Sequence, residues 1–598
     1  MDRRIPPRRL LRLPIATVCG RRVPVAIGLG ARLFGLSHLD RESAGSGLLI
    51  PRCASVHTFG MRFPLDLVFL DRDGVPVSVR RRVPPRRLIF DNRASAVLEL
   101  PSLPGDRVTE DRRETRPKTM TVREVNVSSR PLERLRDVIE PQAWQRLEAG
   151  LRRARELLEG RRVWNVNSTS SGGGVAEMLW SWVGLARSVG VDMRWLTIAG
   201  SADFFVLTKR LHNYLHGEIG DGGELGQGEH SIFERVSQES AEALIERMAP
   251  GDIAFLHDPQ TAGLIPRLAA AGRTVVWRCH IGSDERNALT AAGWDFLAPY
   301  VTRADAVVFS RRAFVPEVCE GMLTAIVPPS IDPFSPKNQE MDPETVRAIL
   351  RRVGLLAPAD HGDGERAEPI FRRPDESEAR VERRCEVVAE GGLPDADARL
   401  VVQVSRWDRL KDPAGVMHGF AGVLAAGDDA WLILAGPSHG SVTDDPDGAA
   451  VLAEVEAEWR RLPDPIRARV LLASLPMEDL DENGAIVNAL QRQAAIVVQK
   501  SLKEGFGLTV TEAMWKARPT VATAVGGIED QIEDGVTGVL LRNPLDLEAF
   551  AAAVGRLLAD SERARAIGEA AREKVRAEFL VDRHILQYVE LLERLPAG

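Results

Sequence analysis

The sequence predicts an α/β protein with two doubly wound, Rossmann-like domains that face a cleft, preceded by a small, mainly β domain. Apolar strand-like runs alternate with amphipathic helical runs over residues 131–345 and again over residues 398–565. This alternation is typical of a parallel sheet covered by helices on both faces. In residues 1–105, by contrast, short β-branched segments are separated by Gly and Pro. A chain of 598 residues is long enough for several domains, each with its own core.

The composition favours a globular protein in water over a membrane protein or a disulfide-rich secreted one. Hydrophobic residues make up 44% of the chain, the mean hydropathy is -0.13, and no apolar run reaches the ~20 residues of a membrane helix. The five cysteines lack CxxC spacing, so neither a disulfide framework nor a zinc site is predicted. The net charge of -7 does not favour nucleic acid as a partner. The basic start has no uninterrupted apolar run, so we expect a cytoplasmic protein without a membrane partner.

Residues 1–105 contain a hairpin signal and a short motif. Two strand-like runs, Leu65–Leu70 and Val75–Val79, flank an Asp-Gly turn, which supplies the positive φ values of a tight turn. The stretch CASVHTFGMRFPLDLVFLD resembles the core motif of an uncharacterised bacterial family, domain of unknown function 192. The positions that carry this resemblance are Cys53, His57, Thr58, Met61, Asp66 and Phe69. Cys53 with His57 fits a nucleophile pair, half of a metal site, or a packed thiol beside a hydrogen-bonded histidine.

The first α/β domain is predicted to open with a glycine-rich turn. A charged linker is expected over residues 106–130, and helices should follow within residues 131–160. The first strand, RRVWNVN, then leads into Gly172, Gly173 and Gly174 before a helix begins. Doubly wound folds bind ligands at such a turn. Because GxGxxG spacing and a following lysine are both missing, neither a dinucleotide site nor an ATP site is predicted.

The second α/β domain is separated from the first by a charged stretch. Residues 346–397 are rich in Arg, Asp and Glu with scattered Gly and Pro, so we expect a flexible insertion near a hinge. Strands and helices resume over residues 398–565, and residues 566–598 are predicted to be helical. Two such domains leave a cleft between the carboxyl ends of their sheets, where ligands should lie.

The stretch QKSLKEGFGLTVTEAMWKA of the second domain carries the strongest site signal. Glu504 and Glu512 bracket a Gly-Phe-Gly turn and the start of a predicted helix. The free N–H groups and the dipole of a helix start favour a phosphate, and acids beside a phosphate suit hydroxyl groups. Alternatively, the glycines only turn the chain and the glutamates form a solvated helix face.

Two further loops at the same sheet edge favour binding. Arg406 and Lys411 follow one strand, and Gly526 with Gly527 follows another. Taken alone, the two cations would be ordinary surface charges. Together with an amide-lined helix start and two carboxylates, they suit a nucleoside diphosphate attached to a sugar.

These motifs resemble the retaining GT-B glycosyltransferases, a family that includes sucrose, glycogen and trehalose synthases. The two glutamates, with seven residues between them, match the family motif E-x7-E, and Arg406 with Lys411 matches its diphosphate-binding pair. The resemblance spans residues 131–595 apart from the charged insertion. Within the family, four stretches are similar to trehalose synthases, which join a nucleotide-activated glucose to free glucose. They are similar also to retaining trehalose phosphorylases, which use glucose 1-phosphate. The stretches are VWNVNSTSSGGGVAEML, HDPQ, RCHIG and PPSIDPFSPKN.

The resemblance implies a donor site on the second domain. Arg406 and Lys411 would hold the diphosphate, Glu504 the hydroxyls of the donor glucose, and Glu512 the ribose hydroxyls. One loop would turn its backbone amides toward phosphate or sugar, namely those of Gly505, Phe506, Gly507 and Leu508.

The resemblance also implies an acceptor side on the first domain. His280 would lie over the donor sugar, and Gly173 with Gly174 would let the backbone approach the substrates closely. His257 and Asp258, of the HDPQ stretch, would belong to the sugar-binding residues. The expected catalytic group is Glu504, Arg406, Lys411 and His280.

The expected reaction forms trehalose with retention of configuration, by attack on the face from which the diphosphate leaves. No cofactor and no metal are expected, because Arg406 and Lys411 would supply positive charge at the leaving phosphate. The expected ligands are a nucleoside diphosphate glucose and glucose, and a homodimer is one assembly considered. The alternatives are a phosphorylase, a GT-B transferase with another acceptor, and a sugar-sensing or assembly module without turnover.

Overall fold

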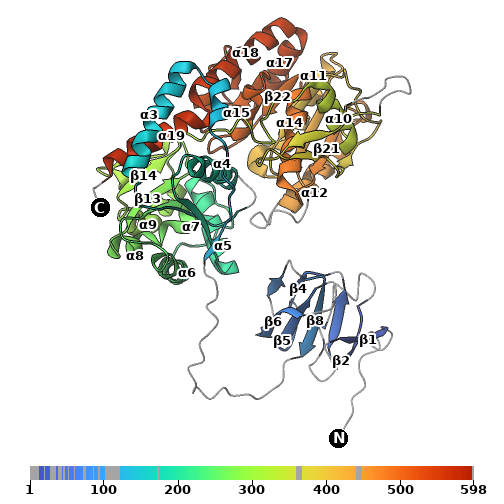
Figure 1. The fold of residues 1–598 in the computed structure, drawn as a ribbon. Coiled ribbons are helices and arrows are strands. Elements are labelled where there is room, and N and C mark those ends of the chain that lie inside the picture. The colour runs from blue at the N-terminus through green and yellow to red at the C-terminus, as the bar shows by residue number, and fades with distance from the viewer. Residues whose placement is uncertain are drawn as a thin grey trace, which may run out of the picture. The chain divides into compact units, whose positions relative to one another are not determined.

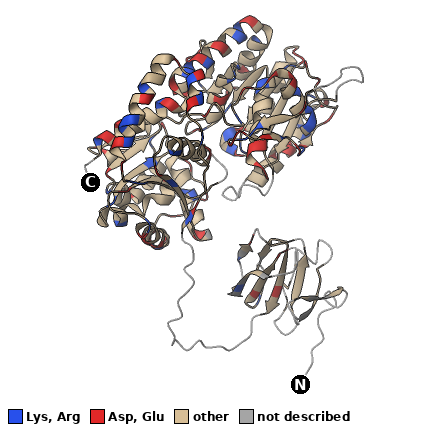
Figure 2. Cartoon of the chain, viewed as in Figure 1, with Lys and Arg blue, Asp and Glu red and all other residues tan. Residues whose placement is uncertain are grey.

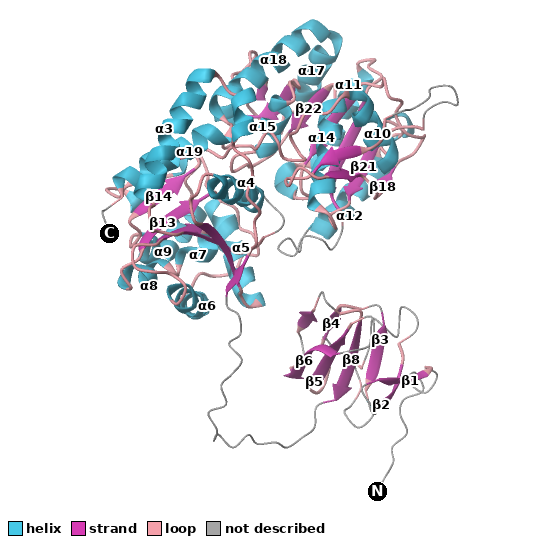
Figure 3. Cartoon of the chain, viewed as in Figure 1, coloured by secondary structure: helices cyan, strands magenta, loops and turns pink. Residues whose placement is uncertain are grey.

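In the computed structural model the chain forms two compact units, Met1–Arg116 and Pro117–Gly598. In the first unit the structure describes residues 13–18, 21–26, 36–37, 39, 44, 47–51, 53–58, 61–71, 76–84, 87–91 and 94–101. In the second unit it describes residues 122–170, 174–358, 367–438 and 448–595. The described part of the first unit consists mainly of strands and loops, whereas strands and helices alternate in the second (Figure 1, Figure 3).

The described part of the first unit is built on a four-stranded antiparallel sheet with the order β3-β8-β5-β6. Its strands are β3 (Leu48–Pro51), β5 (Leu65–Leu70), β6 (Pro76–Val83) and β8 (Ala96–Pro101). The unit also holds two strand pairs, β1 (Ile15–Val18) with β2 (Arg21–Pro24) and β4 (Ser55–His57) with β7 (Leu88–Phe90). The predicted pairing of the two strands is confirmed, because β5 pairs antiparallel with β6 and Leu65, Leu67 and Phe69 fill the core, while the Asp-Gly turn lies outside the described residues.

Cys53 of the first unit is half-buried, and its Sγ donates a hydrogen bond to the carbonyl of Ser55 at 2.8 Å. The buried hydroxyl of Thr58 similarly donates to the carbonyl of Pro84 at 2.8 Å. Contacts of this kind are typical of packed structural residues. The side chain of His57 lies outside the described residues, so its pairing with Cys53 stays a prediction.

The first half of the second unit is a sheet with the strand order β15-β14-β13-β12-β10-β11-β9 over the described residues. All its strands run parallel except β9, which is antiparallel to β11 at one edge. From β10 the chain passes to β11 on one side and then to β12 on the other, so the carboxyl end of β10 is a topological switch point. The strands are β9 (Val122–Glu124), β10 (Val163–Asn167), β11 (Met193–Ile198), β12 (Ile253–His257), β13 (Thr274–Cys279), β14 (Ala306–Phe309) and β15 (Thr324–Ile326). The helices are α3 (Pro141–Leu157), α4 (Gly174–Ser188), α5 (Ala202–Leu215), α6 (Gln227–Ile245), α7 (Pro259–Ala262), α8 (Ile265–Ala270) and α9 (Ala288–Val301).

The second half is a similar sheet with the order β18-β21-β20-β19-β22-β23-β24 over the described residues. Here only the edge strand β18 is antiparallel to its neighbour, and the switch point lies between β19 and β22. The strands are β18 (Glu386–Val388), β19 (Leu400–Val404), β20 (Trp431–Pro437), β21 (Val470–Leu475), β22 (Ile496–Gln499), β23 (Thr520–Thr523) and β24 (Val539–Leu541). The helices are α10 (Pro343–Val353), α11 (Pro413–Ala425), α12 (Gly448–Arg461), α13 (Asp464–Arg467), α14 (Leu480–Gln493), α15 (Leu508–Trp515), α16 (Ile528–Gln531), α17 (Leu547–Ala559), α18 (Ser561–Glu578) and α19 (Val581–Arg594). The predicted fold class is therefore confirmed.

The charged stretch 346–397 differs from the flexible insertion expected from its composition. Its described residues include most of α10, the hairpin of β16 (Ile370–Arg372) with β17 (Glu378–Arg380), and the sheet strand β18. Phe371 and Val381 are 3% and 0% exposed in the core of the second half. Arg373 forms ion pairs with Asp479 and Asp481 at 2.5 and 3.1 Å. Two buried apolar side chains and the ion pairs of Arg373 therefore hold this stretch against the second half, although its composition is polar on average.

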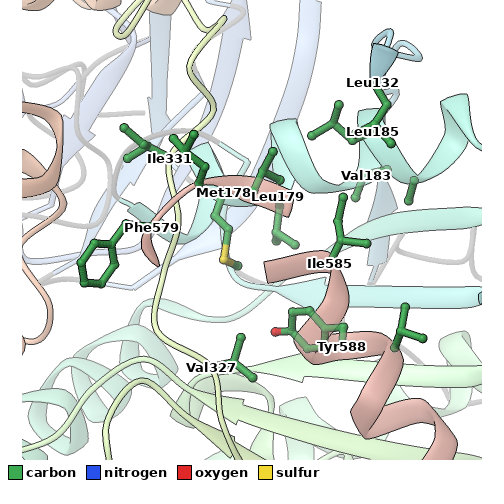
Figure 4. Close-up of a cluster of buried hydrophobic side chains, with 14 of the residues drawn as sticks. Leu132, Met178, Leu179, Val183, Leu185, Val327, Ile331, Phe579, Ile585 and Tyr588 are labelled. Atoms are coloured by element: carbon green, nitrogen blue, oxygen red, sulfur yellow. The ribbon is translucent and has the colours of Figure 1, made fainter. Parts of the chain in front are cut away.

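The carboxyl-terminal helix returns to the first half of the unit. α19 packs beside α3, and the buried guanidinium of Arg278, on β13, donates to His584 and Tyr588 of α19 (Figure 1). The chain crosses between the two halves twice, over residues 327–342 between β15 and α10 and over residues 579–580 between α18 and α19. These two crossings meet where the backbone N–H of Ile331 donates to the carbonyl of Phe579 at 2.9 Å. Figure 4 shows the apolar cluster that covers this junction, with Leu132, Met178, Leu179, Val183, Leu185, Val327, Ile331, Phe579, Ile585 and Tyr588 labelled.

Charges of both signs are interleaved along the outer helices, as α3 and α18 show (Figure 2). Their sequences place Arg and Glu close together on faces that remain in water. No helix in the described parts of the chain combines the length and the apolar character needed to span a membrane.

Candidate active site

The start of α15 and the glycine turn before it form the centre of the candidate site. α15 begins directly after Gly507, whose φ of 85° lies in the left-handed region that favours glycine. A Cβ on Gly505 would lie 3.2 Å from the carbonyl oxygen of His280, so this turn touches the first half of the unit. A Cβ on Gly526 would overlap the carbonyl oxygen of Glu504 at 1.8 Å. The two glycine loops therefore pack backbone against backbone, which leaves no room for a side chain at Gly526.

Glu504 forms an ion pair with Lys411 at the carboxyl ends of β22 and β19. Oε2 of Glu504 lies 2.6 Å from Nζ of Lys411, and the two side chains are 12% and 15% exposed. Oγ of Ser501 also donates to this carboxylate, at 3.3 Å. Arg406 lies in the same loop as Lys411, is 37% exposed, and is 3.7 Å from Asp408. The structure thus brings together Lys411 and Glu504 from two separate loops, with Arg406 in the loop of Lys411.

A buried network that sequence reasoning missed fixes the loop of Lys411. Asp412 has a φ of 47°, and its carboxylate accepts the backbone N–H of Gly415 and pairs with Nζ of Lys500. Lys500 is 1% exposed. Nε2 of Gln403 donates to the carbonyl of Lys411 at 3.0 Å. An aspartate in the left-handed backbone conformation is strained, and strained residues of this kind are concentrated at functional sites.

Two predicted histidines at the ends of β12 and β13 form a hydrogen-bonded pair. Nδ1 of His257 lies 3.1 Å from Nε2 of His280, and Nε2 of His257 lies 3.2 Å from Oδ1 of Asn165 on β10. Because the amide nitrogen of Asn165 faces the carbonyl of Arg194, its oxygen accepts a hydrogen bond from Nε2–H of His257. Nδ1 of His257 then accepts from Nε2–H of His280. The network leaves Nδ1 of His280 as an acceptor.

These side chains are held without charge. Burial, together with the charge of Arg278, lowers the pKa of His257 to about 3, and the same causes lower the pKa of His280. Asp258 has a φ of 63°, and its Oδ1 accepts the backbone N–H of His280 at 2.7 Å. Burial raises the pKa of Asp258 to about 7, against the opposing effects of that hydrogen bond and of Arg278. The first half of the unit therefore presents hydrogen-bonding groups with little net charge.

Two histidines that the sequence analysis did not select lie four residues apart, His212 in the last turn of α5 and His216 directly after its end. Their ring centroids are 4.8 Å apart, and a Cβ on Gly505 would lie 4.0 Å from Cε1 of His216. Burial and the charge of Lys411 lower the pKa of His216 to about 4, and burial lowers the pKa of His212. The only sequence signal was the i, i+4 spacing, which places both rings on one helix face.

Glu512, the second predicted acid, occupies a different environment from Glu504. It lies one helical turn, about 6 Å, beyond Leu508 and is 2% exposed. Its Oε1 lies 3.2 Å from Nζ of Lys337, and its Oε2 has no hydrogen-bond partner among the described residues. A buried carboxylate oxygen without a donor is costly and is expected to bind one.

A cavity of about 670 Å³ lies beside Glu512 and Leu508. Roughly 300–1,000 Å³ is usual for a small-molecule site. Both halves of the unit and the crossing between them form its walls, and Glu504, Lys411 and His280 lie outside its lining. Wall residues include Glu177, Trp180, Asp332, Lys337, Arg373, Met477 and Asp479. The cavity and the Lys411–Glu504 pair are therefore two separate places, both close to the same short helix.

Of the remaining predicted residues, Gly174 and Phe506 lie near the start of α15. Gly173 is outside the described residues. Gly174 is the first residue of α4, and a Cβ there would lie 3.1 Å from Cδ1 of Leu508, so α4 and α15 begin side by side. The side chain of Phe506 is 6% exposed and packs against Phe579, with ring centroids 5.9 Å apart. Only the backbone of Phe506 is thus available to a ligand.

Three family models match this chain. Residues 18–104 match a family described as Uncharacterized ACR, and residues 165–316 match the trehalose synthase, N-terminal domain, family. Residues 389–574 match the glycosyl transferases group 1 family. The first match falls in the first unit, and the other two fall in the two halves of the second.

Similar proteins include two trehalose synthases and a trehalose phosphorylase. The synthase of Rubrobacter xylanophilus is 35% identical over 443 residues, which cover 73% of this chain and 91% of that protein. The synthase of Pyrococcus horikoshii is 31% identical over 475 residues, covering 79% of this chain and 99% of that protein. The phosphorylase of Pleurotus pulmonarius is 27% identical over 473 residues, covering 75% of this chain and 58% of that protein.

Solved structures show the same fold. A trehalose-6-phosphate synthase matches with a TM-score of 0.55 and 12% identity, covering 73% of this chain and 99% of that structure. An α,α-trehalose-phosphate synthase (UDP-forming) from Burkholderia vietnamiensis matches with a TM-score of 0.53 and 16% identity, covering 73% and 98%. The sequence identity to the two trehalose synthases extends over most of each of them. The chain therefore belongs to the trehalose synthase family and is a glycosyltransferase of the GT-B fold.

Proposed function

We propose that this chain forms trehalose by transferring glucose from a nucleoside diphosphate glucose to free glucose, with retention of configuration. The observation that carries the proposal is the arrangement along α15. The Lys411–Glu504 pair lies before its first turn, and the buried carboxylate of Glu512 faces a cavity after it. A diphosphate at this helix start would direct its sugar toward Glu504 and its nucleoside toward Glu512.

On the donor side, charged groups would bind charge and carboxylates would bind hydroxyls. Lys411 and Arg406 neutralise the diphosphate and stabilise it as it leaves. Glu504 accepts hydrogen bonds from the glucose hydroxyls, and Glu512 accepts them from the ribose. The amides at the start of α15 contact phosphate or sugar, namely those of Gly505, Phe506, Gly507 and Leu508.

On the acceptor side, neutral groups would orient the sugars. His280, with Nδ1 as an acceptor, receives a sugar hydroxyl, and His257 holds His280 in that tautomer. Asp258 belongs to the sugar-binding residues, and Gly173 with Gly174 allows close approach of the backbone. The acceptor hydroxyl attacks the anomeric carbon on the face that the diphosphate leaves, and a phosphate oxygen takes its proton. The bond between the anomeric carbon and the diphosphate oxygen breaks as the glycosidic bond to the acceptor forms.

A phosphorylase reaction would leave part of this site unused. Glucose 1-phosphate has no nucleoside, so it offers neither a base for the cavity nor ribose hydroxyls for Glu512. The match to the phosphorylase also covers only 58% of that protein, against 91% and 99% for the two synthases. These observations favour the nucleotide-dependent reaction.

The test incubates purified protein with ADP-, GDP- or UDP-glucose, with and without glucose, and with glucose 1-phosphate. Chromatography should detect trehalose and an equal amount of nucleoside diphosphate only when a nucleotide glucose and glucose are both present. A chelator should leave the rate unchanged, because Arg406 and Lys411 supply the positive charge in this scheme. Glu504→Gln should abolish transfer while the circular dichroism spectrum stays the same. Trehalose formed only from glucose 1-phosphate would overturn the proposal.

A further inference from the structure

Lys337 lies on the crossing between the two halves and contacts a carboxylate from each of them. Its Nζ lies 3.0 and 3.2 Å from the two carboxylate oxygens of Glu177 on α4. The same nitrogen lies 3.2 Å from Oε1 of Glu512 on α15. All three side chains line the cavity of about 670 Å³. Lys337 is therefore placed to act on both the cavity and the relative position of the two helices.

The other lysine near Glu512 is Lys516, whose ammonium group is hydrogen-bonded to atoms other than the Glu512 carboxylate. Nζ of Lys516 donates to Oδ1 of Asn338 and to the backbone carbonyl of Glu512, and burial lowers the pKa of Lys516 well below its usual value. Burial raises the pKa of Glu512, and the charge of Lys337 opposes that rise. The ammonium of Lys337 lies between two carboxylates, which raise its pKa although burial alone lowers it. Both lysines favour the ionised form of Glu512, but Lys337 is the one that forms an ion pair with its carboxylate among the described residues.

We propose that Lys337 is a positioning residue for the nucleotide: it binds Oε1 of Glu512, fixes this buried side chain on the cavity wall, and leaves Oε2 free to accept the ribose hydroxyls. This inference rests on the proposed function and deepens it. Oε2 has no partner among the described residues and belongs to a side chain that is 2% exposed on the cavity wall. An ionised oxygen accepts two hydroxyls, whereas a protonated carboxyl offers weaker acceptors.

A simpler role for Lys337 would be to join the two halves of the unit through Glu177. The two roles differ in what they predict for a ligand without ribose hydroxyls. If Lys337 acts through Glu512, its removal weakens only ligands whose hydroxyls reach Oε2. If it only joins the halves, its removal weakens ligands with and without those hydroxyls alike.

The experiment measures binding by titration calorimetry with the full chain. Whichever of ADP, GDP and UDP binds most tightly is compared with its 2′,3′-dideoxy counterpart. Lys337→Met should weaken the ribonucleotide about 10-fold or more, the usual size of a lost hydrogen bond to a charged group, and leave the dideoxy nucleotide within about 2-fold. Lys337→Arg should recover most of the affinity. The transfer reaction should show the loss in KM for the donor, with kcat nearly unchanged.

A pH series gives a second readout. Glu177, Lys337 and Lys516 are the charged neighbours that act most on Glu512. Without Lys337, the largest charge that opposes the raised pKa of Glu512 is lost, so ribonucleotide affinity in Lys337→Met should recover as the pH rises and the carboxyl ionises. Glu285→Gln is a matched control, because it breaks another lysine pair across the halves, with Lys503 at 3.1 Å, away from the cavity. It should change neither affinity.

Each result separates the possible explanations. Equal loss for both nucleotides in Lys337→Met, or unchanged binding of both, would overturn the inference and leave the proposed function standing. Failure of the unmodified protein to bind any nucleoside diphosphate would overturn both. If Lys337→Met does not fold, the same comparison in Glu512→Gln and Lys337→Arg decides, because a selective ribonucleotide loss in the first and its absence in the second are required.

Discussion

The two sides of the candidate site differ in the charge of the side chains that they present. On the second half of the unit, Lys411 with Glu504 forms an ion pair. On the first half, His257 and His280 are held neutral, and the pKa of Asp258 is raised to about 7. A diphosphate carries charge and is bound by ions, whereas glucose carries none and is bound by directed hydrogen bonds. The contrast supports the proposed division of the site between a charged leaving group and an uncharged acceptor.

The largest expected effect comes from removing charge on the charged side. Lys411→Ala should lower kcat by about 100- to 1,000-fold, the usual cost of losing one group that stabilises developing charge. The variant also leaves Glu504 without its cation beside the diphosphate, which adds repulsion. Steady-state kinetics with the best nucleotide glucose measures the loss.

Arg409→Ala is the matched control for this change. Arg409 belongs to the same short helix, Arg409–Lys411, but it pairs with Glu454 and its side chain is 60% exposed. It should retain nearly full activity. A similar loss of activity in both variants would show that only the total positive charge of the loop matters. It would contradict a specific role for Lys411 on the charged side.

A smaller effect is expected from adding charge on the neutral side. Asn165→Asp would place a carboxylate next to Nε2 of His257 and raise the pKa of that histidine from about 3. A protonated His257 would donate to His280 and reverse its tautomer, so Nδ1 of His280 would no longer accept. We expect kcat/KM to fall about 10-fold at low pH, the scale of one lost hydrogen bond to substrate, and to recover as the pH rises.

The control for that variant is Asn167→Asp on the same strand. Oδ1 of Asn167 accepts a hydrogen bond from Nε1 of Trp195 at 2.8 Å, and aspartate can still accept it. Its pH profile of kcat/KM should match that of the unmodified protein between pH 5 and pH 9. A profile for Asn165→Asp that matches this control would contradict the tautomer derived for His280.

The smallest effect concerns stability. The pKa of Asp258 is raised from 3.8 to about 7, so between these values the folded chain holds a proton that the unfolded chain releases. Stability from this group is therefore lost as the pH rises through that window. Asp258→Asn cannot ionise, so its thermal midpoint should fall less between pH 5 and pH 8 than that of the unmodified protein. Equal shifts, followed by circular dichroism, would show that Asp258 is already ionised at pH 5.

Residues that follow the strands of one sheet could be brought together from the sequence. Lys411 and Glu504 follow β19 and β22, which are neighbours in a parallel sheet, so their loops meet at one edge. His257 and His280 came from the family resemblance instead, and they too lie at neighbouring strand ends, those of β12 and β13. Reasoning from strand ends could not find Lys337, because a crossing between two domains has no periodic pattern that states which helix it touches.

Composition and helix spacing were weaker guides. The stretch 346–397 is predicted to be flexible because its composition is highly charged. In the structure, however, Phe371 and Val381 pack into a hydrophobic core. His216 was missed because a histidine on an amphipathic helix is an ordinary feature until its neighbours are known. In both cases a few long-range contacts outweighed the local average.

The sequence by itself determined the two doubly wound domains, the edge of each sheet that carries the site, and the motif that indicates the family. Those properties follow from local periodicity and from the geometry of parallel strands. Only the tertiary structure decided that Glu504 forms an ion pair with Lys411 while Glu512 is buried on a cavity wall beside Lys337. Burial and ion pairing depend on groups far apart in the chain, and the environment of each acid therefore exists only after the two domains have come together.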